Sequence, residues 1–315
     1  MSRKHFPKAF YHTVALLTVG VWGTTFIATK ILLNNGLNPA SIFFYRFLLA
    51  YLLMLWVSRG EKRRADNWQD ELKAVGLGLG GGSLYFLTEN TALYHTLSTQ
   101  VAFILCTAPL FTAILIGLFN RTLKQTFKTT FILGSVLALG GVALVIFNGR
   151  FILKLSPKGD LLCLAAALCW AFYTLLLKDM EKRYGNRFLT RKVFGYGLLT
   201  ILPYFLYEPL HYAPETLARP VVWGNLLFLG VVASMICYLS WNKAVRELGA
   251  LTVTPYIYLS PIFTSVASAL ILHEPMSGFG AVGALCIIAG VYGAATGFRR
   301  PAGRRHAAGG ADQAV

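Results

Sequence analysis

The stretch VWGTTFIATK at residues 21–30 returns, altered but recognisable, as CWAFYTLLLK at residues 169–178. In both stretches a Lys follows a Trp by eight positions, and the two tryptophans, Trp22 and Trp170, are 148 residues apart. Self-similarity at a fixed spacing is the sign of a repeated structural unit. The chain is therefore expected to contain two copies of one unit.

Other segments repeat at an almost equal offset. LTENTA at 87–92 aligns with LSWNKA at 239–244, and APLFT at 108–112 aligns with SPIFT at 260–264, in each case 152 residues later. Two glycines near the end of the first unit return 149 residues later. A nearly constant offset over half of the chain indicates that the whole unit was duplicated.

The composition indicates what surrounds these units. Apolar residues make up 56% and charged residues 13% of the 315, and the mean hydropathy is +0.57. Soluble domains carry about 25% charged residues, so this chain is expected to lie mostly in lipid. A helix needs about 20 apolar residues to cross a hydrocarbon core of about 30 Å. Ten stretches are suited to this, at 12–32, 40–58, 74–95, 99–118, 129–147, 159–177, 191–207, 221–243, 251–272 and 278–298.

These stretches divide evenly between the two copies. We predict an all-α polytopic membrane protein of ten transmembrane helices, with five-helix repeats at 10–148 and 157–298 and a disordered cytoplasmic tail at 299–315. Five is an odd number, so the second copy enters the membrane from the opposite side. Inverted repeats of this kind recur in secondary transporters, where the two halves exchange conformations and open alternately to each face.

The net charge of +16 is unevenly distributed. If the N-terminus is cytoplasmic, the connections on that side hold 23 of the 29 Lys and Arg residues. Short cytoplasmic loops of membrane proteins show this excess, so we predict that both termini are cytoplasmic. A nucleic-acid surface would gather basic and stacking side chains on one folded face. We therefore predict no nucleic-acid partner.

The residue types that enzymes and metal sites use are scattered. All five cysteines lie in apolar stretches without a CxxC pair, as is typical of small core residues. The histidines form no HExxH motif, and no serine has a partnered base. We predict no catalytic residues, no metal and no cofactor, so a membrane-embedded enzyme is the least favoured interpretation.

Several motifs carry a resemblance to a known family. WGTTFIATK (22–30), YRFLLA (45–50), ENTALYHT (89–96), and CTAPLFT (106–112) answered by LSPIFT (259–264) are similar to EamA-type members of the drug/metabolite transporter superfamily. The resemblance covers roughly residues 10 to 298. It implies a multi-pass carrier of a bacterial-type inner (plasma) membrane, usually an exporter of small metabolites, amino acids or drugs, with a central cavity between the halves.

The resemblance does not specify what is carried. We expect a small, largely apolar metabolite, amino acid or drug that is exported by alternating access, with a proton as an optional coupling ion. A flippase for lipids or lipid headgroups is the alternative. The glycine run at 76–82 and the glycine-rich tenth helix predict close helix contacts, with a homodimer face as one option, so the oligomeric state is left open.

Matching prolines, Pro109 and Pro261, are the strongest pointer to a site. Proline removes a backbone donor and clashes with the preceding turn. A helix that is broken at the same point in both halves frees carbonyl groups near the middle of the membrane, where they can line a cavity. A simple packing kink is the alternative explanation.

Two charges of opposite sign are expected inside the membrane. Arg46 and Glu89 lie about 10 Å and 9 Å from the same predicted outer face, at 1.5 Å per helical residue. A pair costs less than either charge alone, so Glu89 is expected to neutralise Arg46. Glu89 could instead border the cavity, as a proton-coupling group or as the counter-charge for an amine.

Aromatic and amide side chains complete the predicted cavity. Trp and Tyr offer an apolar face with one polar tip, and the alternative is an aromatic belt at the membrane surface. Asn90 and Asn242 occur in both copies and either bond the substrate or bridge helices, with bridging slightly favoured. The predicted cavity residues are Trp22, Glu89, Asn90, Tyr94, Trp170, Tyr173, Tyr238, Trp241, Asn242 and Tyr256.

Overall fold

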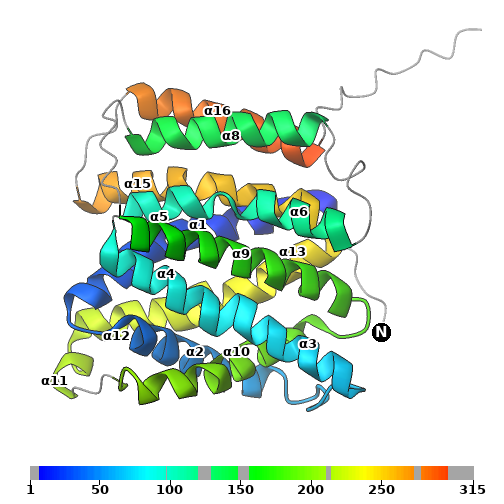
Figure 1. The fold of residues 1–315 in the computed structure, drawn as a ribbon, viewed down its shortest axis with the longest axis vertical. Helices are drawn as coiled ribbons and strands as arrows, with labels where there is room; N and C mark the ends of the chain where they lie inside the picture. Colours follow the sequence, from blue (N-terminus) through cyan, green and yellow to red (C-terminus); the bar gives the residue numbers. More distant parts are fainter. Residues whose placement is uncertain are drawn as a thin grey trace, which may run out of the picture.

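The structure is a computed structural model and describes residues 7–96, 98–119, 129–147, 156–210, 214–272 and 278–296. Every regular element in these ranges is a helix (Figure 1). The predicted tail at 299–315 lies outside the described residues.

The described residues of the first half form seven α-helices and one π-helical segment. They are α1 (Lys8–Asn34), α2 (Pro39–Val57), α3 (Trp68–Gly78), η1 (Leu79–Ser83), α4 (Leu84–His95), α5 (Ser98–Leu105), α6 (Ala108–Phe119) and α8 (Thr129–Phe147). The segments α3, η1 and α4 form one continuous rod.

The second half follows the same order. It contains α9 (Pro157–Met180), α10 (Asn186–Ile201), η2 (Leu202–Leu206), α11 (Pro214–Leu217), α12 (Pro220–Leu227), η3 (Phe228–Ile236), α13 (Cys237–Leu248), α14 (Ala250–Val253), η4 (Thr254–Leu259), α15 (Ser260–Leu272) and α16 (Gly278–Thr296). Here α12, η3 and α13 form the continuous rod that corresponds to α3–η1–α4.

Local sequence explains where several helices begin. The side chain of Asn38 accepts a hydrogen bond from the Ser41 amide at 2.7 Å, and Pro39 follows as the first residue of α2. Ser156 and Pro157 play the same roles at the start of α9. A polar cap satisfies a free amide, and proline at the first position loses no helical hydrogen bond.

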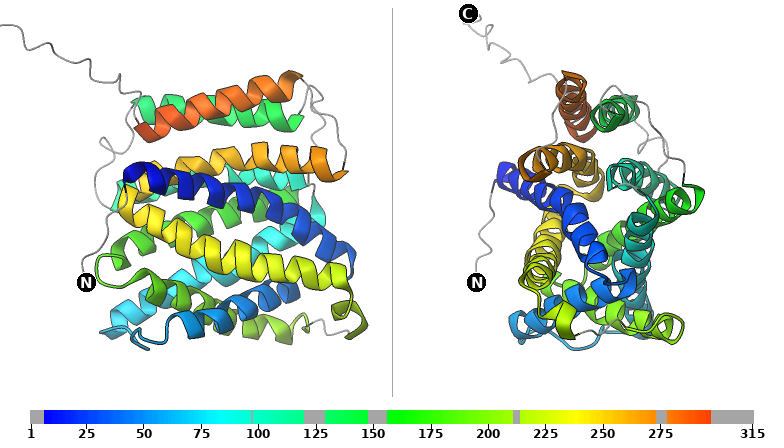
Figure 2. Two further views of the ribbon diagram at one scale, coloured as in Figure 1. Left: turned by 180° about the vertical axis from the view of Figure 1, so that it is seen from behind. Right: turned by 90° about the vertical axis from the view of Figure 1, so that its left-hand side faces the viewer.

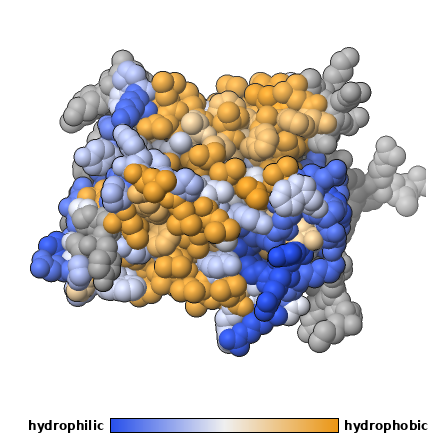
Figure 3. Space-filling model, turned by 60° about the horizontal axis from the view of Figure 1, so that its bottom comes forward, coloured by the Kyte–Doolittle hydropathy of each residue, from blue (hydrophilic) through white to orange (hydrophobic). Residues whose placement is uncertain are grey.

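Helix occupies each of the ten predicted stretches within the described residues. Among the described residues, six helical spans are long and apolar enough to cross a membrane: Lys8–Asn34, Pro39–Val57, Gln100–Phe119, Pro157–Met180, Pro220–Leu248 and Ala250–Ala267. Thr129–Val145 and Ala281–Ala294 are shorter apolar helices. Hydrophobic residues form a belt across the surface, and hydrophilic residues gather toward both ends of the helices (Figure 3). The chain is therefore a multi-pass membrane protein.

The two halves interlock. The first helix of each half packs against helices of the other half: α1 against α13 and α15, and α9 against α4 and α6. Likewise α2 packs against η3, and α10 against α3 and η1. Figure 2 shows α1 lying beside α13 and α15. A space enclosed by these helices is therefore bounded by residues from both halves.

Glycines allow the closest of these contacts. A Cβ atom on Gly134 would lie 2.5 Å from the amide nitrogen of Ala294, and one on Gly141 would lie 2.6 Å from the carbonyl oxygen of Gly283. These contacts join α8 and α16, the pair at the top of Figure 1. In the predicted glycine run, a Cβ atom on Gly78 would lie 2.5 Å from Tyr196 Cβ in α10. These glycines therefore serve helix contacts within the chain.

Ionic contacts fasten one end of the bundle. We call it the charged end; there α1, α3 and α10 begin and α2, α9 and α13 finish. Asp70 of α3 accepts hydrogen bonds from Arg183 at 2.6 Å and from the Tyr184 hydroxyl at 2.8 Å. Glu71 pairs with Lys192 of α10. Burial raises the pKa of Tyr184, and the neighbouring carboxylates of Asp70 and Asp66 act in the same direction. The ion pairs join α3 of the first half to the second half.

Candidate functional site

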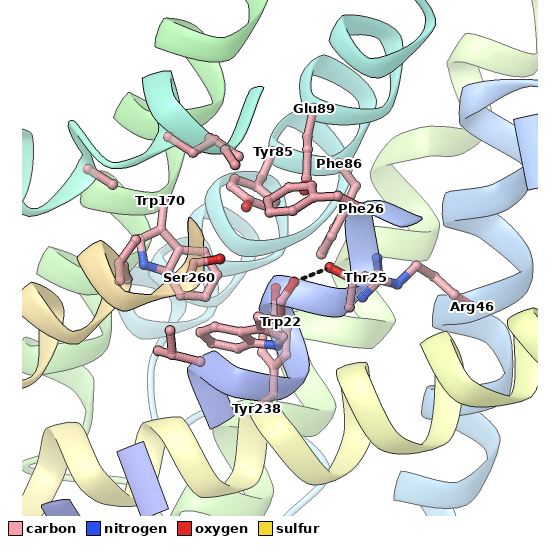
Figure 4. Close-up of a pocket in the computed structure, with 15 residues that line it drawn as sticks. Trp22, Thr25, Phe26, Arg46, Tyr85, Phe86, Glu89, Trp170, Tyr238 and Ser260 are labelled. Carbon is pink, nitrogen blue, oxygen red and sulfur yellow. Dashed lines mark hydrogen bonds between the residues drawn. The ribbon is translucent and has the colours of Figure 1, made fainter. Parts of the chain in front are cut away.

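A cavity lies where the two halves meet (Figure 4). Its lining comes from α1, α2, α4, α5 and α6 of the first half and from α9, α13, η4 and α15 of the second. The centre of a water-sized sphere can occupy about 60 Å³ of it, where a single water needs about 10–15 Å³. In this conformation the cavity therefore has room for a few waters or a small chemical group.

Both predicted prolines stand just after a break in a helix. In the first half α5 ends at Leu105 and α6 begins at Ala108, with Pro109 as its second residue. In the second half the 3-10 segment η4 gives way to α15, with Pro261 as its second residue. The residues one and four positions before each proline line the cavity: Leu105, Ala108, Ile257 and Ser260. The breaks therefore bring equivalent backbone segments to the cavity from the two halves.

Arg46 is buried at the edge of this cavity, with 3% of its surface exposed. Its Nε donates a hydrogen bond to the Ser234 hydroxyl in η3 at 3.0 Å. The guanidinium carbon lies 4.1 Å from the centre of the Phe86 ring, a cation–π contact. The charge is thus stabilised by a hydroxyl of the second half and by an aromatic face.

Glu89 lines the same cavity from α4 and is 5% exposed. Its Oε2 atom has no hydrogen-bond partner among the described residues. Arg46 and Glu89 form no ion pair within 4.0 Å in the described part of the chain, so the predicted contact is not present in this conformation. The physical reason is that Ser234 and Phe86, rather than Glu89, contact the guanidinium.

Aromatic rings form most of the wall. Trp22 and Trp170 meet edge to face with their ring centres 5.2 Å apart, and the ring centre of Tyr85 lies 5.3 Å from that of Trp170 (Figure 4). The Nε1 of Trp170 is buried without a hydrogen-bond partner among the described residues. Tyr238 completes the wall from α13. An apolar wall with few polar atoms suits a largely apolar ligand.

Four predicted residues lie behind the wall. Trp241 is fully buried and packs on Trp22, with ring centres 5.0 Å apart. The Tyr173 hydroxyl donates to the Asn242 side-chain oxygen at 2.6 Å, and Asn90 donates to the Pro39 carbonyl oxygen at 3.0 Å. Asn242, Tyr173 and Asn90 therefore bridge helices.

Two predicted residues lie elsewhere. Tyr94 is 66% exposed near the end of α4. The hydroxyl of Tyr256 is hydrogen-bonded to Nδ1 of His12 at 2.8 Å, and Tyr256 is absent from the cavity lining. Neither residue lines the cavity in this conformation.

Other lining residues were missed by sequence reasoning. Tyr85 precedes Glu89 by four positions and therefore shares its helix face. Ser260 directly precedes Pro261. Both signals were present in the sequence. Thr25 also lines the cavity, and no sequence signal pointed to it. Its hydroxyl donates a hydrogen bond to the Trp22 carbonyl oxygen within the same helix at 2.7 Å (Figure 4).

Comparison with known proteins yields matches over most of the chain. The model of the EamA-like transporter family matches residues 9–147 and again 157–296. An uncharacterized transporter of Archaeoglobus fulgidus is 33% identical over 291 residues, 89% of this chain and 96% of that protein. A probable amino-acid metabolite efflux pump of Escherichia coli is 26% identical, over 89% of this chain and 92% of the pump.

Solved structures share this fold, among them a crystal structure. It superposes with a TM-score of 0.71 at 17% identity, and the match covers 93% of this chain and 100% of the other. At this identity the likeness concerns the fold alone.

Proposed function

Because the chain belongs to the EamA-like transporter family, we propose that it is a secondary transporter that exports a small, largely apolar metabolite by alternating access. The observation that carries this proposal is the cavity, which residues of both halves line together. In a protein built from two similar halves, rearrangement of one half against the other can expose such a site to each face in turn.

The cavity chemistry favours an apolar amino acid or a close derivative. A zwitterion could place its ammonium group against Glu89 and its carboxylate against Arg46, with its side chain on the rings of Trp22 and Trp170. The unpartnered Oε2 of Glu89 is a ready acceptor for an ammonium group. The name of the similar Escherichia coli protein, a probable amino-acid metabolite efflux pump, agrees with this class.

Glu89 and Arg46 are proposed to make and break contact during the cycle. In the conformation described, Arg46 bonds Ser234 and Glu89 has a free oxygen. Binding of a substrate ammonium or of a proton at Glu89 would change the field at Arg46 and favour its movement. Glu89 thereby serves either as the substrate's counter-charge or as a proton-coupling group.

The proposed topology is ten spans in two inverted repeats, at 10–148 and 157–298. Both termini and the charged end face the cytoplasm, in a bacterial-type inner membrane. The oligomeric state, with a homodimer as one option, is not needed for this mechanism, because the cavity is lined within one chain.

Two measurements test this function. Cells that express the protein are challenged with toxic concentrations of amino acids, nucleosides and cationic drugs, and the class against which they are protected is then assayed by flux in proteoliposomes. We expect protection against apolar amino acids. We expect Glu89→Gln to lower the flux at least about tenfold, the effect of one charged contact of about 1.4 kcal/mol. The control is Tyr94→Phe, which changes a ring away from the cavity.

Unchanged flux in Glu89→Gln at every pH would remove Glu89 from the mechanism. Absence of protection against every compound, together with scrambling of fluorescent lipids in the same proteoliposomes, would favour the alternative function of a lipid flippase and contradict the proposal.

A further inference from the structure

Two helix segments with wider turns occupy equivalent positions in the two halves. The segments η1 and η3 are π-helical, and the 152-residue offset between the repeats places η1 within η3. Such turns are rare and frequently occur at functional sites, and sharp bends in helices are often found at them. The backbone of Gly82 in η1 leaves the helical region, with φ −134° and ψ −108°. The two long rods can therefore change direction at these segments.

A cavity side chain from the opposite half holds each segment. The hydroxyl of Tyr238 donates to the carbonyl oxygen of Gly81 in η1 at 2.5 Å. The Nε1 of Trp22 donates to the carbonyl oxygen of Ala233 in η3 at 2.9 Å. Gly81 and Ala233 are themselves equivalent positions, 152 residues apart. The same carbonyl group in both halves thus accepts a hydrogen bond from an aromatic residue of the other half.

The residues equivalent to Trp22 and Tyr238 in the other half do not form these hydrogen bonds. Trp170 is the equivalent of Trp22 and also lines the cavity, but its Nε1 has no partner among the described residues. The equivalent of Tyr238 is Phe86, which has no hydroxyl group. Each π-helical segment therefore accepts a hydrogen bond from one aromatic side chain of the cavity wall. For η1 that side chain is a tyrosine, and for η3 it is a tryptophan.

We propose that Trp22 and Tyr238 are positioning residues of the transport cycle. Each lines the cavity and, through its hydrogen bond, holds the backbone of the π-helical segment in the opposite half. A ligand that displaces the Trp22 ring or the Tyr238 hydroxyl breaks the bond to Ala233 or Gly81 and frees that segment to bend. Cavity occupation is thereby coupled to both halves. The place of this coupling in a transport cycle rests on the proposed function, but its structural basis can be measured without a substrate.

The test is hydrogen–deuterium exchange, read by mass spectrometry, on the full chain in lipid nanodiscs without ligand. We expect Tyr238→Phe to speed amide exchange in η1 about tenfold, the effect of one lost hydrogen bond, and to leave η3 within about twofold. Trp22→Phe should do the reverse, speeding η3 and leaving η1. The matched control is Trp170→Phe, which removes the same ring volume from the same wall without removing a hydrogen bond and should leave both segments at the wild-type rate.

Faster exchange in Trp170→Phe, equal to that in Trp22→Phe, would mean that wall packing holds the segments and would overturn the proposal. So would unchanged exchange of η1 in Tyr238→Phe. That variant lacks a single oxygen atom, so it decides the question if Trp22→Phe does not fold. The expected crossed pattern in a protein that transports nothing would contradict the proposed function and leave this inference standing.

Discussion

At the scale of single residues, Glu181 is a buried carboxyl group outside the apolar spans, and its burial affects its protonation. It follows α9 at the charged end, it is buried, and its Oε1 has no hydrogen-bond partner among the described residues. Burial raises the pKa of Glu181 to about 8; Glu247 acts in the same direction, while Arg246 and Lys243 lower it. Its side chain is therefore largely protonated near neutral pH.

This predicts a pH dependence of stability with a definite sign. The folded protein binds this proton more tightly than the unfolded chain, whose Glu has a pKa near 4.5, so the contribution of Glu181 falls as pH rises and levels off above about 8. The free energy of unfolding of Glu181→Gln, relative to that of wild type, should therefore rise by about 2 kcal/mol as the pH is raised from 6 to 9. Thermal unfolding in nanodiscs measures it. The control is Glu215→Gln on the exposed α11, and a difference that does not vary with pH would contradict the assignment.

At the scale of helices, the contact between α8 and α16 depends on the absence of side chains. Membrane helices associate through small residues because apolar burial gives no advantage over lipid. A Cβ atom on Gly141 would lie 2.6 Å from the Gly283 carbonyl oxygen, whereas one on the neighbouring Gly140 would have no atom within 4 Å. The two adjacent glycines therefore differ only in what they face.

This pair provides a matched test. Gly141→Ala should destabilise the protein by about 1–3 kcal/mol, because the backbones of the two helices must separate. Gly140→Ala should be neutral or stabilise by up to about 1 kcal/mol, because Ala favours the helix over Gly. Both are read as shifts of the unfolding temperature in nanodiscs. Equal destabilisation by both substitutions would show that this close contact is not what holds the helices together.

At the scale of the whole molecule, the interlocking of the halves gives the two ends of the bundle different chemistry. The charged end has ion pairs that join α3 to the second half, such as Asp70 with Arg183. The opposite end has neutral or single-charge contacts, such as the Lys30 ammonium with the Leu93 carbonyl oxygen at 2.7 Å. Because the cytoplasmic loops of membrane proteins carry an excess of basic residues, the charged end is expected to face the cytoplasm.

Cysteine labelling tests this orientation. In a background with the five native cysteines replaced, Lys62→Cys lies between α2 and α3 at the charged end, and Arg219→Cys lies before α12 at the opposite end. A membrane-impermeant maleimide should label Arg219→Cys in intact cells and Lys62→Cys only after permeabilisation. Labelling of both positions from one side would contradict the inverted repeat, and the reversed pattern would place the charged end outside.

The sequence by itself determined the helical class, the approximate positions of the helices and the existence of two related units. These follow from length, apolar composition and a constant offset, which are properties of the chain read in order. It also indicated the two helix breaks, because proline acts on its own backbone. Trp22, Arg46, Glu89, Trp170 and Tyr238 were predicted for the site and line the cavity.

Only the tertiary structure decided which polar atoms meet. Arg46 bonds Ser234, 188 residues away, in place of Glu89, and Trp22 bonds Ala233, 211 residues away. Trp241 and Tyr94 are aromatic residues of membrane helices like Trp22, yet one is buried behind the wall and the other is exposed. The physical reason is that the rotation of an apolar helix about its axis is set by its neighbours, since lipid and protein interior are equally apolar.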